Sequence, residues 1–345
     1  MQFGIIGSGS WATALTKILT DNHHPVNWLV RSESMLDHIL KRGHNPNYLH
    51  SAFLNTAMLH ISTDLSKVVS ASEILVIAVP SAYVTDTLKS LSKNAFTGKK
   101  IISAVKGILP EDNILLNDYL YKEFNVAIND YFTIMGPCHA EEVAAEKLSY
   151  LTFSGADEEA AMVIASHFKT DYLNTIVNDD VYGVQFAAVL KNIYAMGAGI
   201  AYGLDYGDNF LSVLIANCAD EMAAFLREVG IHHIEVGVHD GEDPVTHKKR
   251  ANYAASVYLG DLLVTCYSLY SRNRSFGNMI GKGYSVKAAQ LELNMVAEGY
   301  NASKCINLIN KNIKAEMPIA ETVYKILWEQ LSPAAGFKQI EEVLV

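Results

Sequence analysis

The chain has 345 residues, half of them hydrophobic and 19% charged, which is the composition of a folded globular protein long enough for two domains. Its 37 acidic and 27 basic residues give a formal net charge of −10. Nucleic acids and anionic membranes require a positive field, so this charge argues against both partners and leaves small anionic ligands open.

The cysteines and the apolar segments indicate the compartment. Cys138, Cys218, Cys266 and Cys305 lie far apart without a CxxC pair, which favours reduced thiols over a disulfide framework or a zinc ribbon. No apolar run reaches the roughly 18 residues that a membrane span needs, and Met1 leads almost directly into the first predicted strand. We therefore expect a cytoplasmic protein.

The first half of the chain alternates between short β-like runs and segments with helical periodicity. After an initial strand near residues 3–6, the predicted strands are 26–30, 74–79, 101–104, 132–135 and 150–153. This alternation predicts an α/β fold of the Rossmann type, with a doubly wound, mostly parallel sheet. Continuous apolar runs such as ILVIAV indicate strands that are covered on both faces.

The character of the sequence changes near residue 180. Residues 180–204 have long helical spacing, and helical segments are also predicted at 212–229, 254–270, 285–299 and 318–331. We therefore predict two domains, 1–179 and a largely α-helical 180–345.

A histidine-rich stretch, 232–250, is predicted to be an exposed loop. The spacing of His232, His233, His239 and His247 matches no zinc motif, so we predict no metal site.

A glycine-rich turn follows the first strand, in the sequence FGIIGSGSWATAL from residue 3. Gly7 permits a tight turn, Gly9 lets the backbone approach a pyrophosphate, and Ala12 takes the third small position. Ala14 and Leu15 then start a helix-like pattern, and the N-terminus of such a helix offers free N–H groups and a partial positive charge. Strand, turn and helix together predict dinucleotide binding, the alternative being a merely tight turn.

The end of the second strand bears on the identity of the dinucleotide. An acidic residue about twenty positions after the glycine motif usually binds the ribose, but Arg31 and Ser32 stand there. An arginine can hold a 2′-phosphate or stack on adenine, which favours NADP(H) without excluding NAD(H). The alternative is an exposed surface arginine.

Lys191 lies within the long helical segment on a face of apolar and small residues. Its neighbours there are Val184, Ala187, Ala195 and Gly199. A lysine on such a face either reaches an edge of the protein or has a function. A desolvated lysine is suited to general acid–base catalysis near neutral pH.

Two further sets of polar residues indicate ligand contacts. Lys106 follows the strand 101–104, and residues 136–142 follow the strand 132–135, which places both at the carboxyl ends of strands, where open α/β sheets bind ligands. Later in the chain, Arg272 stands between Ser271 and Asn273. An arginine beside hydroxyl and amide groups suits phosphate recognition, the alternative being a solvated helix end.

These segments together resemble the soluble bacterial NAD(P)-dependent glycerol-3-phosphate dehydrogenase family. The matching segments occur in family order from near residue 4 to residue 300: GSGSWATAL, VPS (79–81), KG (106–107), GPCHAEE (136–142), GVQFAAVLKNIYAMGAGI (183–200), GDLLVTC (260–266), SRNRSFG (271–277) and VAEGY (296–300).

The resemblance implies reversible hydride transfer between NAD(P)(H) and dihydroxyacetone phosphate, giving sn-glycerol 3-phosphate for phospholipid synthesis. Lys191 is similar to the family's proton acceptor. The implied catalytic residues are Lys191, Asn192, Asp261 and Lys106; the cofactor positions are Gly7, Gly9, Ser10, Trp11, Ala12, Arg31, Lys106, Ala140, Arg272, Val296 and Glu298; the substrate positions are Lys106, Gly136, Cys138, Lys191, Asp261, Thr265, Ser271, Arg272 and Asn273.

The sequence departs from the family at Ala12, which replaces the third glycine, and at Cys138 and His139, which replace a small hydroxyl residue and an aromatic. The alternatives are a related β-hydroxyacid or sugar-acid dehydrogenase and a non-catalytic dinucleotide-sensing module. The expected partners are a small phosphate ester and, by analogy with related layouts, a second copy in a homodimer.

Overall fold

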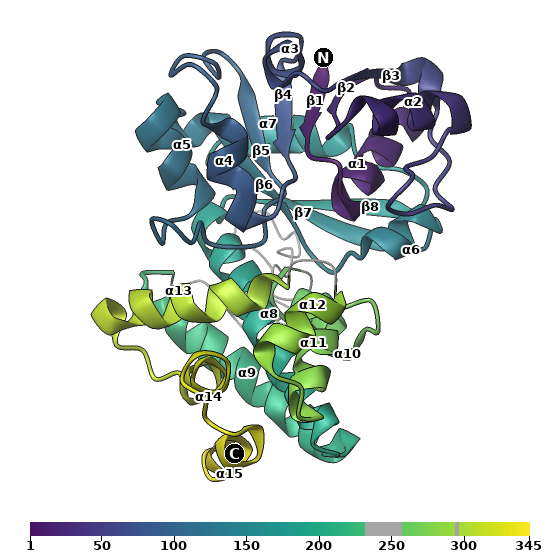
Figure 1. The fold of residues 1–345 in the computed structure, drawn as a ribbon. Helices are drawn as coiled ribbons and strands as arrows, with labels where there is room; N and C mark the ends of the chain where they lie inside the picture. Colours follow the sequence, from purple (N-terminus) through teal and green to yellow (C-terminus); the bar gives the residue numbers. More distant parts are fainter. Residues whose placement is uncertain (232–256, 294–296) are drawn as a thin grey trace. The chain divides into compact units, whose positions relative to one another are not determined.

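The computed structural model describes residues 1–231, 257–293 and 297–345 (Figure 1). The chain divides into two compact units. Unit 1 comprises Met1–Leu109 and Ile114–Val181, and unit 2 comprises Pro110–Asn113 and Tyr182–Val345. The histidine-rich stretch and Val296 lie outside the described residues.

Unit 1 is built on an eight-stranded sheet with the order β3-β2-β1-β4-β5-β6-β7-β8. Neighbouring strands are parallel except β6 and β7, which are antiparallel. The predicted Rossmann-type sheet is therefore confirmed, with two strands, β3 and β8, that the sequence reading did not name. The strands are β1 (Phe3–Ile6), β2 (Val26–Leu29), β3 (Leu59–Ser62), β4 (Ile74–Ile77), β5 (Lys100–Ser103), β6 (Tyr131–Met135), β7 (Ser149–Gly155) and β8 (Leu173–Asn178).

Three helices of unit 1, α2, α3 and α7, begin at residues whose side chains accept hydrogen bonds from the first turn. Ser32 caps the helix that follows β2, and Asp157 caps the one that follows β7. The helices are α1 (Ser10–Asp21), α2 (Glu33–Arg42), α3 (Leu65–Ser70), α4 (Val84–Leu88), α5 (Leu116–Phe124), α6 (Ala140–Ala144) and α7 (Glu158–Ser166), with short 3₁₀ turns at Thr56–Met58, Ser81–Tyr83 and Ile128–Asp130.

The central strands of this sheet are buried on both faces. Successive side chains of a strand point to opposite faces. Ile5 accordingly packs into a core with Leu15 of α1, whereas Ile6 packs into a second core with Leu88 of α4. This explains the continuous apolar strands, and it leaves the ends of the strands as the places for polar chemistry.

All the regular secondary structure in the described part of unit 2 is helical (Figure 1). The sequence reading named no helix at α11 or α15, and its segment 285–299 covers α12 and only the start of α13. The helices are α8 (Val181–Gly203), which begins at the last residue of unit 1, α9 (Asp208–Glu228), α10 (Leu259–Tyr267), α11 (Arg272–Gly281), α12 (Val286–Leu293), α13 (Glu298–Ile313), α14 (Pro318–Trp328) and α15 (Pro333–Glu341).

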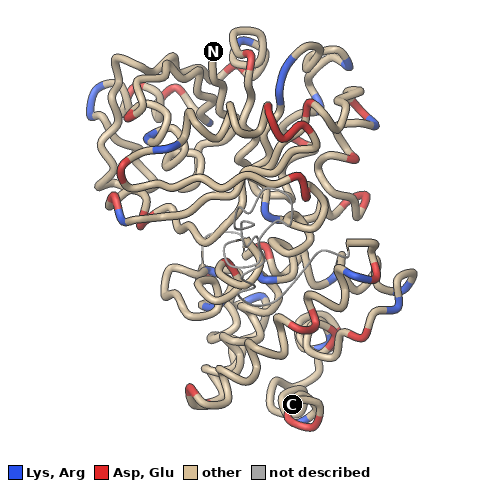
Figure 2. Tube along the Cα trace, turned by 180° about the vertical axis from the view of Figure 1, so that it is seen from behind, with Lys and Arg blue, Asp and Glu red and all other residues tan. Residues whose placement is uncertain are grey.

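Two of the described helices, α8 and α9, are long and apolar enough to cross a membrane by length and composition alone. In α8, 94% of the most apolar stretch is buried inside the protein, and in α9 the buried share is 56%. Mostly buried core helices of soluble proteins have the same length and composition. Figure 2 shows basic residues dispersed among acidic ones in the described parts of both units.

Candidate active site

The predicted glycine turn joins β1 to α1 at the carboxyl end of a central strand. Gly7 has φ +130°, and a Cβ there would lie 2.5 Å from the carbonyl oxygen of Ala78 on the neighbouring strand's extension. Glycine is therefore required at this position by the protein itself. Ala12 is buried in the core between helix and sheet, which explains why a small residue occupies the third position.

Gly9 is different, because no contact within the described residues requires a glycine there. Its φ is −80°, and a Cβ would meet no atom within 4 Å. It is also the N-cap of α1, and as a glycine it has no side chain that could accept a hydrogen bond from the helix N-terminus. Open space at an uncapped helix N-terminus fits the close approach of a pyrophosphate, so this turn fits a dinucleotide.

Two side chains hold this turn from within unit 1, and sequence reasoning named neither of them as a site residue. Trp28 Nε1 donates to the carbonyl oxygen of Gly7 at 2.8 Å. Asn45 Nδ2 donates to the carbonyl oxygen of Ser8 at 3.2 Å and to Thr13 Oγ1 at 2.8 Å. No sequence motif connects Asn45 to a turn more than thirty residues away, so only the folded chain shows the contact.

Lys106 lies beside the start of α1, as its position after β5 suggested. Its ammonium group is 5.5 Å from the centre of the Trp11 ring and 3.5 Å from the carbonyl oxygen of Gly136. The indole N–H of Trp11 is buried and has no hydrogen-bond partner within the described part of the chain. A buried donor of this kind is satisfied when a ligand supplies an acceptor. The structure therefore brings Lys106, Trp11 and Gly136 together.

The other site residues predicted in unit 1 differ in how far they are exposed to solvent. Arg31 is exposed and lies two residues after the end of β2. Cys138 is 7% exposed and belongs to the apolar core, and Ala140 is the first residue of α6 and is buried. Ser10 is the first residue of α1 and is half-buried.

In unit 2, Lys191 of α8 forms an ion pair with Asp261 of α10. Lys191 is 3% exposed and Asp261 is 1% exposed, so the ammonium group does not reach solvent. The hydroxyl group of Thr265 donates to the carbonyl oxygen of Asp261 at 2.6 Å and lies 3.4 Å from its carboxylate. Burial of a charged lysine requires a counter-charge, and Asp261 supplies it.

The next residue of α8, Asn192, connects three helices. Its Oδ1 accepts from Asn273 Nδ2 of α11 at 2.9 Å, and Asn273 Oδ1 accepts from the backbone N–H of Gly299 in α13 at 3.0 Å. Both asparagines are buried. This network fixes the first turns of α11 and α13 beside the helix that carries Lys191.

Arg272 is the first residue of α11 and is exposed, next to the buried Ser271 that caps this helix by accepting from Arg274 N–H. Glu298 is the first residue of α13. Among the cofactor positions that the resemblance implies, Arg272 and Glu298 therefore belong to unit 2, and Val296 lies outside the described residues.

Cys266 of α10 lies near the ion pair and was not among the predicted site residues. Burial raises the pKa of its thiol to about 12, although the positive charges of Lys191 and Arg274 act in the opposite direction. The thiol is therefore protonated and unreactive at neutral pH. This environment gives no support to covalent thiol chemistry here.

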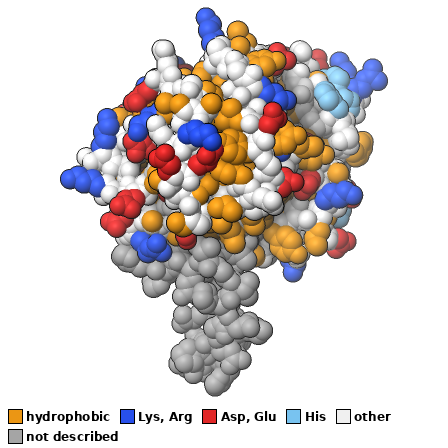
Figure 3. Space-filling model, turned by 90° about the horizontal axis from the view of Figure 1, so that it is seen from below, with side chains coloured by type: hydrophobic (Ala, Val, Ile, Leu, Met, Phe, Trp, Pro, Cys, Tyr) orange, Lys and Arg blue, Asp and Glu red, His pale blue; other side chains and the backbone are white. Residues whose placement is uncertain are grey.

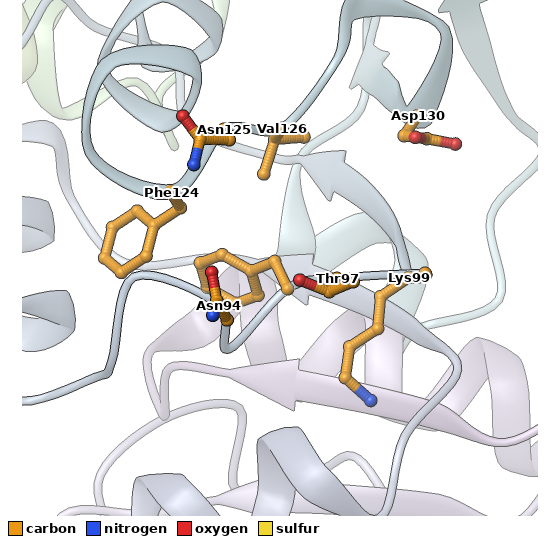
Figure 4. A pocket seen from close by; sticks show the side chains of 9 residues that line it. Asn94, Thr97, Lys99, Phe124, Asn125, Val126 and Asp130 are labelled. Atoms are coloured by element: carbon orange, nitrogen blue, oxygen red, sulfur yellow. The ribbon is translucent and has the colours of Figure 1, made fainter.

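A separate pocket lies at the opposite edge of the sheet, beside the amino-terminal ends of β5 and β6 (Figure 4). It contains none of the predicted site residues. The lining residues are Asn94, Phe96, Thr97, Gly98, Lys99, Phe124, Asn125, Val126 and Asp130.

Two models of known protein families match most of the chain. The family model described as the N-terminus of NAD-dependent glycerol-3-phosphate dehydrogenase matches residues 2–161, and the model of its C-terminus matches residues 180–338. The chain belongs to the NAD-dependent glycerol-3-phosphate dehydrogenase family. The resemblance inferred from the motifs is thereby confirmed.

Individual members of this family match over nearly their full length. Glycerol-3-phosphate dehydrogenase [NAD(P)+] of Thermoanaerobacter sp. (strain X514) is 34% identical over 337 residues, which cover 96% of this chain and 94% of the relative. The enzyme of the same name from Bacillus pumilus is 32% identical over 94% of this chain and 89% of its own.

Solved structures show the same architecture. A crystal structure of glycerol-3-phosphate dehydrogenase from Coxiella burnetii has a TM-score of 0.86 and 25% identity, covering 99% of this chain and 98% of its own. A ketopantoate reductase of the PanE/ApbA family from Ralstonia eutropha has a TM-score of 0.58 and 14% identity, with 99% and 100% coverage. The latter likeness extends to the fold alone, so the reading as a hydroxyacid dehydrogenase is not favoured.

Proposed function

We propose that this chain catalyses reversible hydride transfer between NAD(P)(H) and the C2 carbon of dihydroxyacetone phosphate, which yields sn-glycerol 3-phosphate. The observation that carries the proposal is the buried Lys191–Asp261 ion pair on α8 and α10, in a chain of this family. A non-catalytic dinucleotide sensor has no need of a buried ammonium group with its own carboxylate partner.

The β1–α1 turn holds the dinucleotide in this proposal. Gly7, Gly9 and Ala12 shape the turn, and the N-terminus of α1 at Ser10 faces the pyrophosphate. When bound, the nicotinamide ring supplies or accepts the hydride. Further cofactor contacts are assigned to Trp11, Arg31, Lys106, Ala140, Arg272, Val296 and Glu298.

Lys191 is the general acid and base. As C2 is reduced, negative charge develops on the carbonyl oxygen, and the ammonium group of Lys191 donates a proton to it. In the oxidation of glycerol 3-phosphate, the neutral amine accepts the hydroxyl proton. Asp261 holds the ammonium group in place through the ion pair, and Asn192 fixes the neighbouring backbone through Asn273.

The substrate's phosphate is held at the start of α11. Arg272 offers a planar fork of donors, and its exposure leaves it accessible to an anion. Holding the phosphate fixes the position of the reacting carbon, which is the main contribution of such contacts to rate. The other substrate contacts are assigned to Lys106, Gly136, Cys138, Asp261, Thr265, Ser271 and Asn273.

Four finer assignments belong to the same proposal: a dinucleotide-binding domain over 1–179, a substrate-binding domain over 180–345, a cytoplasmic homodimer, and a supply of glycerol 3-phosphate for phospholipid synthesis. Exposed apolar side chains of unit 2, such as Leu263, Leu269 and Leu291, support pairing of two copies. Figure 3 shows one face of the molecule on which hydrophobic side chains lie in groups between charged ones. Sedimentation velocity tests the dimer.

The decisive experiment follows the absorbance of NADH or NADPH after mixing with the protein and dihydroxyacetone phosphate. Oxidation of the dinucleotide with formation of glycerol 3-phosphate is expected. Oxidation only with β-keto acids would favour the hydroxyacid dehydrogenase, and binding without oxidation would favour the sensor. A large preference for NADH would contradict the 2′-phosphate contact assigned to Arg31.

A further inference from the structure

The three carbonyl groups of the β1–α1 turn all have hydrogen-bond partners on the inner side of the turn. The carbonyl oxygen of Gly7 accepts from Trp28 Nε1, and that of Ser8 accepts from Asn45 Nδ2. The carbonyl oxygen of Gly9 accepts from Thr13 Oγ1 at 2.9 Å and from Thr13 N–H at 3.0 Å. Each carbonyl is thus held in one direction by a specific donor.

This arrangement also sets the direction of the backbone N–H groups. In a trans peptide unit, the C=O of one residue and the N–H of the next point in opposite directions. Because the carbonyls of Gly7, Ser8 and Gly9 are held inward, the N–H groups that follow them, up to Ser10, point outward. A Cβ at Gly9 would meet no described atom within 4 Å, so the turn is open at this residue.

The side-chain amide of Asn45 makes hydrogen bonds through both its nitrogen and its oxygen. Its side chain is 0% exposed, and both Nδ2 hydrogens are donated, one to Ser8 and one to Thr13. Its Oδ1 accepts from the backbone N–H groups of Asn47 at 3.0 Å and Tyr48 at 3.2 Å. A side-chain amide can donate two hydrogen bonds and accept two, and Asn45 makes all four. Any replacement therefore leaves buried groups without partners.

We infer that Asn45 and Trp28 are positioning residues for dinucleotide binding: they orient the turn's backbone N–H groups toward the pyrophosphate without touching it. The inference rests on the proposed function, because it assumes that the β1–α1 turn holds a dinucleotide. It assigns a role to two residues that carry no ligand-binding motif and lie outside the glycine-rich sequence. A preorganised set of donors binds an anion without the cost of ordering the loop.

The test uses neutral variants, so that no charge repels the pyrophosphate. Asn45→Leu removes both donors at similar volume, and Trp28→Phe removes one donor while keeping an aromatic ring. Asn27→Leu is the matched control, because Asn27 is also a buried amide of β2 whose Nδ2 donates to Ala71 O at 3.0 Å and Ser72 Oγ at 3.1 Å, away from the turn.

Titration calorimetry with NADH and with ADP-ribose, which carries the pyrophosphate but no nicotinamide, gives the dissociation constants. We expect both constants to rise at least about tenfold in Asn45→Leu and Trp28→Phe and to stay within about twofold in Asn27→Leu. In steady-state kinetics, the KM for the dinucleotide should rise while kcat and the KM for dihydroxyacetone phosphate are kept. A merely structural defect would lower thermal stability without raising the KM for the dinucleotide selectively.

Each result has a definite meaning. Normal affinity in both turn variants, with a wild-type protein that reduces dihydroxyacetone phosphate, overturns the inference and leaves the proposed function standing. Equal losses in the Asn27→Leu control also overturn it, since they show a general effect of burial. If Asn45→Leu does not fold, Trp28→Phe decides. A wild-type protein that binds neither NADH nor ADP-ribose removes the proposed function and the inference together.

Discussion

Gly277 of α11 lies so close to Met196 of α8 that a Cβ at Gly277 would be 2.0 Å from the Met196 carbonyl oxygen. The contact is backbone against backbone. It recurs nearby, because a Cβ at Gly199 of α8 would lie 2.1 Å from the carbonyl oxygen of Arg274. Glycines on both helices therefore allow the helix that carries Asn273 to lie directly against the helix that carries Lys191.

The substitution Gly277→Ala should separate these helices. We expect a loss of about 1–3 kcal/mol or more in unfolding free energy, because overpacking against backbone cannot be relieved by a change of rotamer. Activity should also fall, since the 2.9 Å hydrogen bond between Asn192 and Asn273 depends on the close approach. Thermal unfolding and kcat measure the two effects. Gly207→Ser is the control, because a Cβ at Gly207 meets open space; equal stability of both variants would contradict the prediction.

Removal of the lysine should abolish most of the chemistry. Lys191→Met should lower kcat by about 10²–10⁴-fold, the usual contribution of a general acid, while the dissociation constant for NADH stays near the wild-type value. Wild-type turnover in this variant would exclude Lys191 from the reaction.

Asp261→Asn separates the structural role of the ion pair from the catalytic one. Loss of the carboxylate removes the negative counter-charge of a buried ammonium group, which costs about 3–5 kcal/mol of unfolding free energy. The double variant Lys191→Met/Asp261→Asn removes both charges and should be more stable than Asp261→Asn alone. Chemical denaturation of the wild type, the two single variants and the double variant gives the four unfolding free energies. If the two single losses of unfolding free energy add up to the loss in the double variant, the ion pair contributes no coupling energy.

The exposed arginine of α11 should matter for substrate affinity. Arg272→Ala should raise the KM for dihydroxyacetone phosphate at least about tenfold, because charge-assisted hydrogen bonds to a phosphate are lost. Lys282→Ala removes another exposed cation just beyond the C-terminus of the same helix and should have no such effect. Unchanged saturation by dihydroxyacetone phosphate in Arg272→Ala would reject the phosphate assignment.

Acid should destabilise unit 1 through a pair of histidines. His167 Nδ1 lies 3.1 Å from His24 Nε2, and both rings pack against Phe3. Burial lowers the pKa of both rings below the ordinary value of 6.5, and the charge of His167 lowers that of His24 further. The unfolded chain therefore binds protons that the folded chain does not. The stability from this pair is present above pH 6.5 and is lost as the pH falls toward the lowered values.

Thermal unfolding above and below pH 6.5 tests whether stability falls on the acid side. His167→Gln should reduce the loss of stability on the acid side, whereas His60→Gln, a change at an exposed histidine of β3, should leave the pH dependence as in the wild type. A pH dependence that is the same in all three proteins would assign the acid sensitivity to other groups.

The sequence by itself determined the features that depend on local order along the chain. A strand followed within a few residues by Gly7, Gly9 and Ala12 can form only a tight turn into a helix, and the alternation of apolar runs predicts the parallel sheet. The apolar face around Lys191 likewise indicated a lysine that either reaches an edge of the protein or has a function, and in the structure this side chain is buried. Periodicity and turn chemistry act over short distances, which is why these predictions succeeded.

Only the tertiary structure decided which distant side chains meet. Asp261 faces Lys191, and Asn45 reaches the glycine turn, because helices and loops remote in sequence pack against one another. The approach of Gly277 to Met196 likewise depends on the crossing of two helices. A hydrogen bond or an ion pair between distant residues leaves no periodic trace in the sequence, since the energy of each contact comes from burial and geometry that exist only once the core has formed.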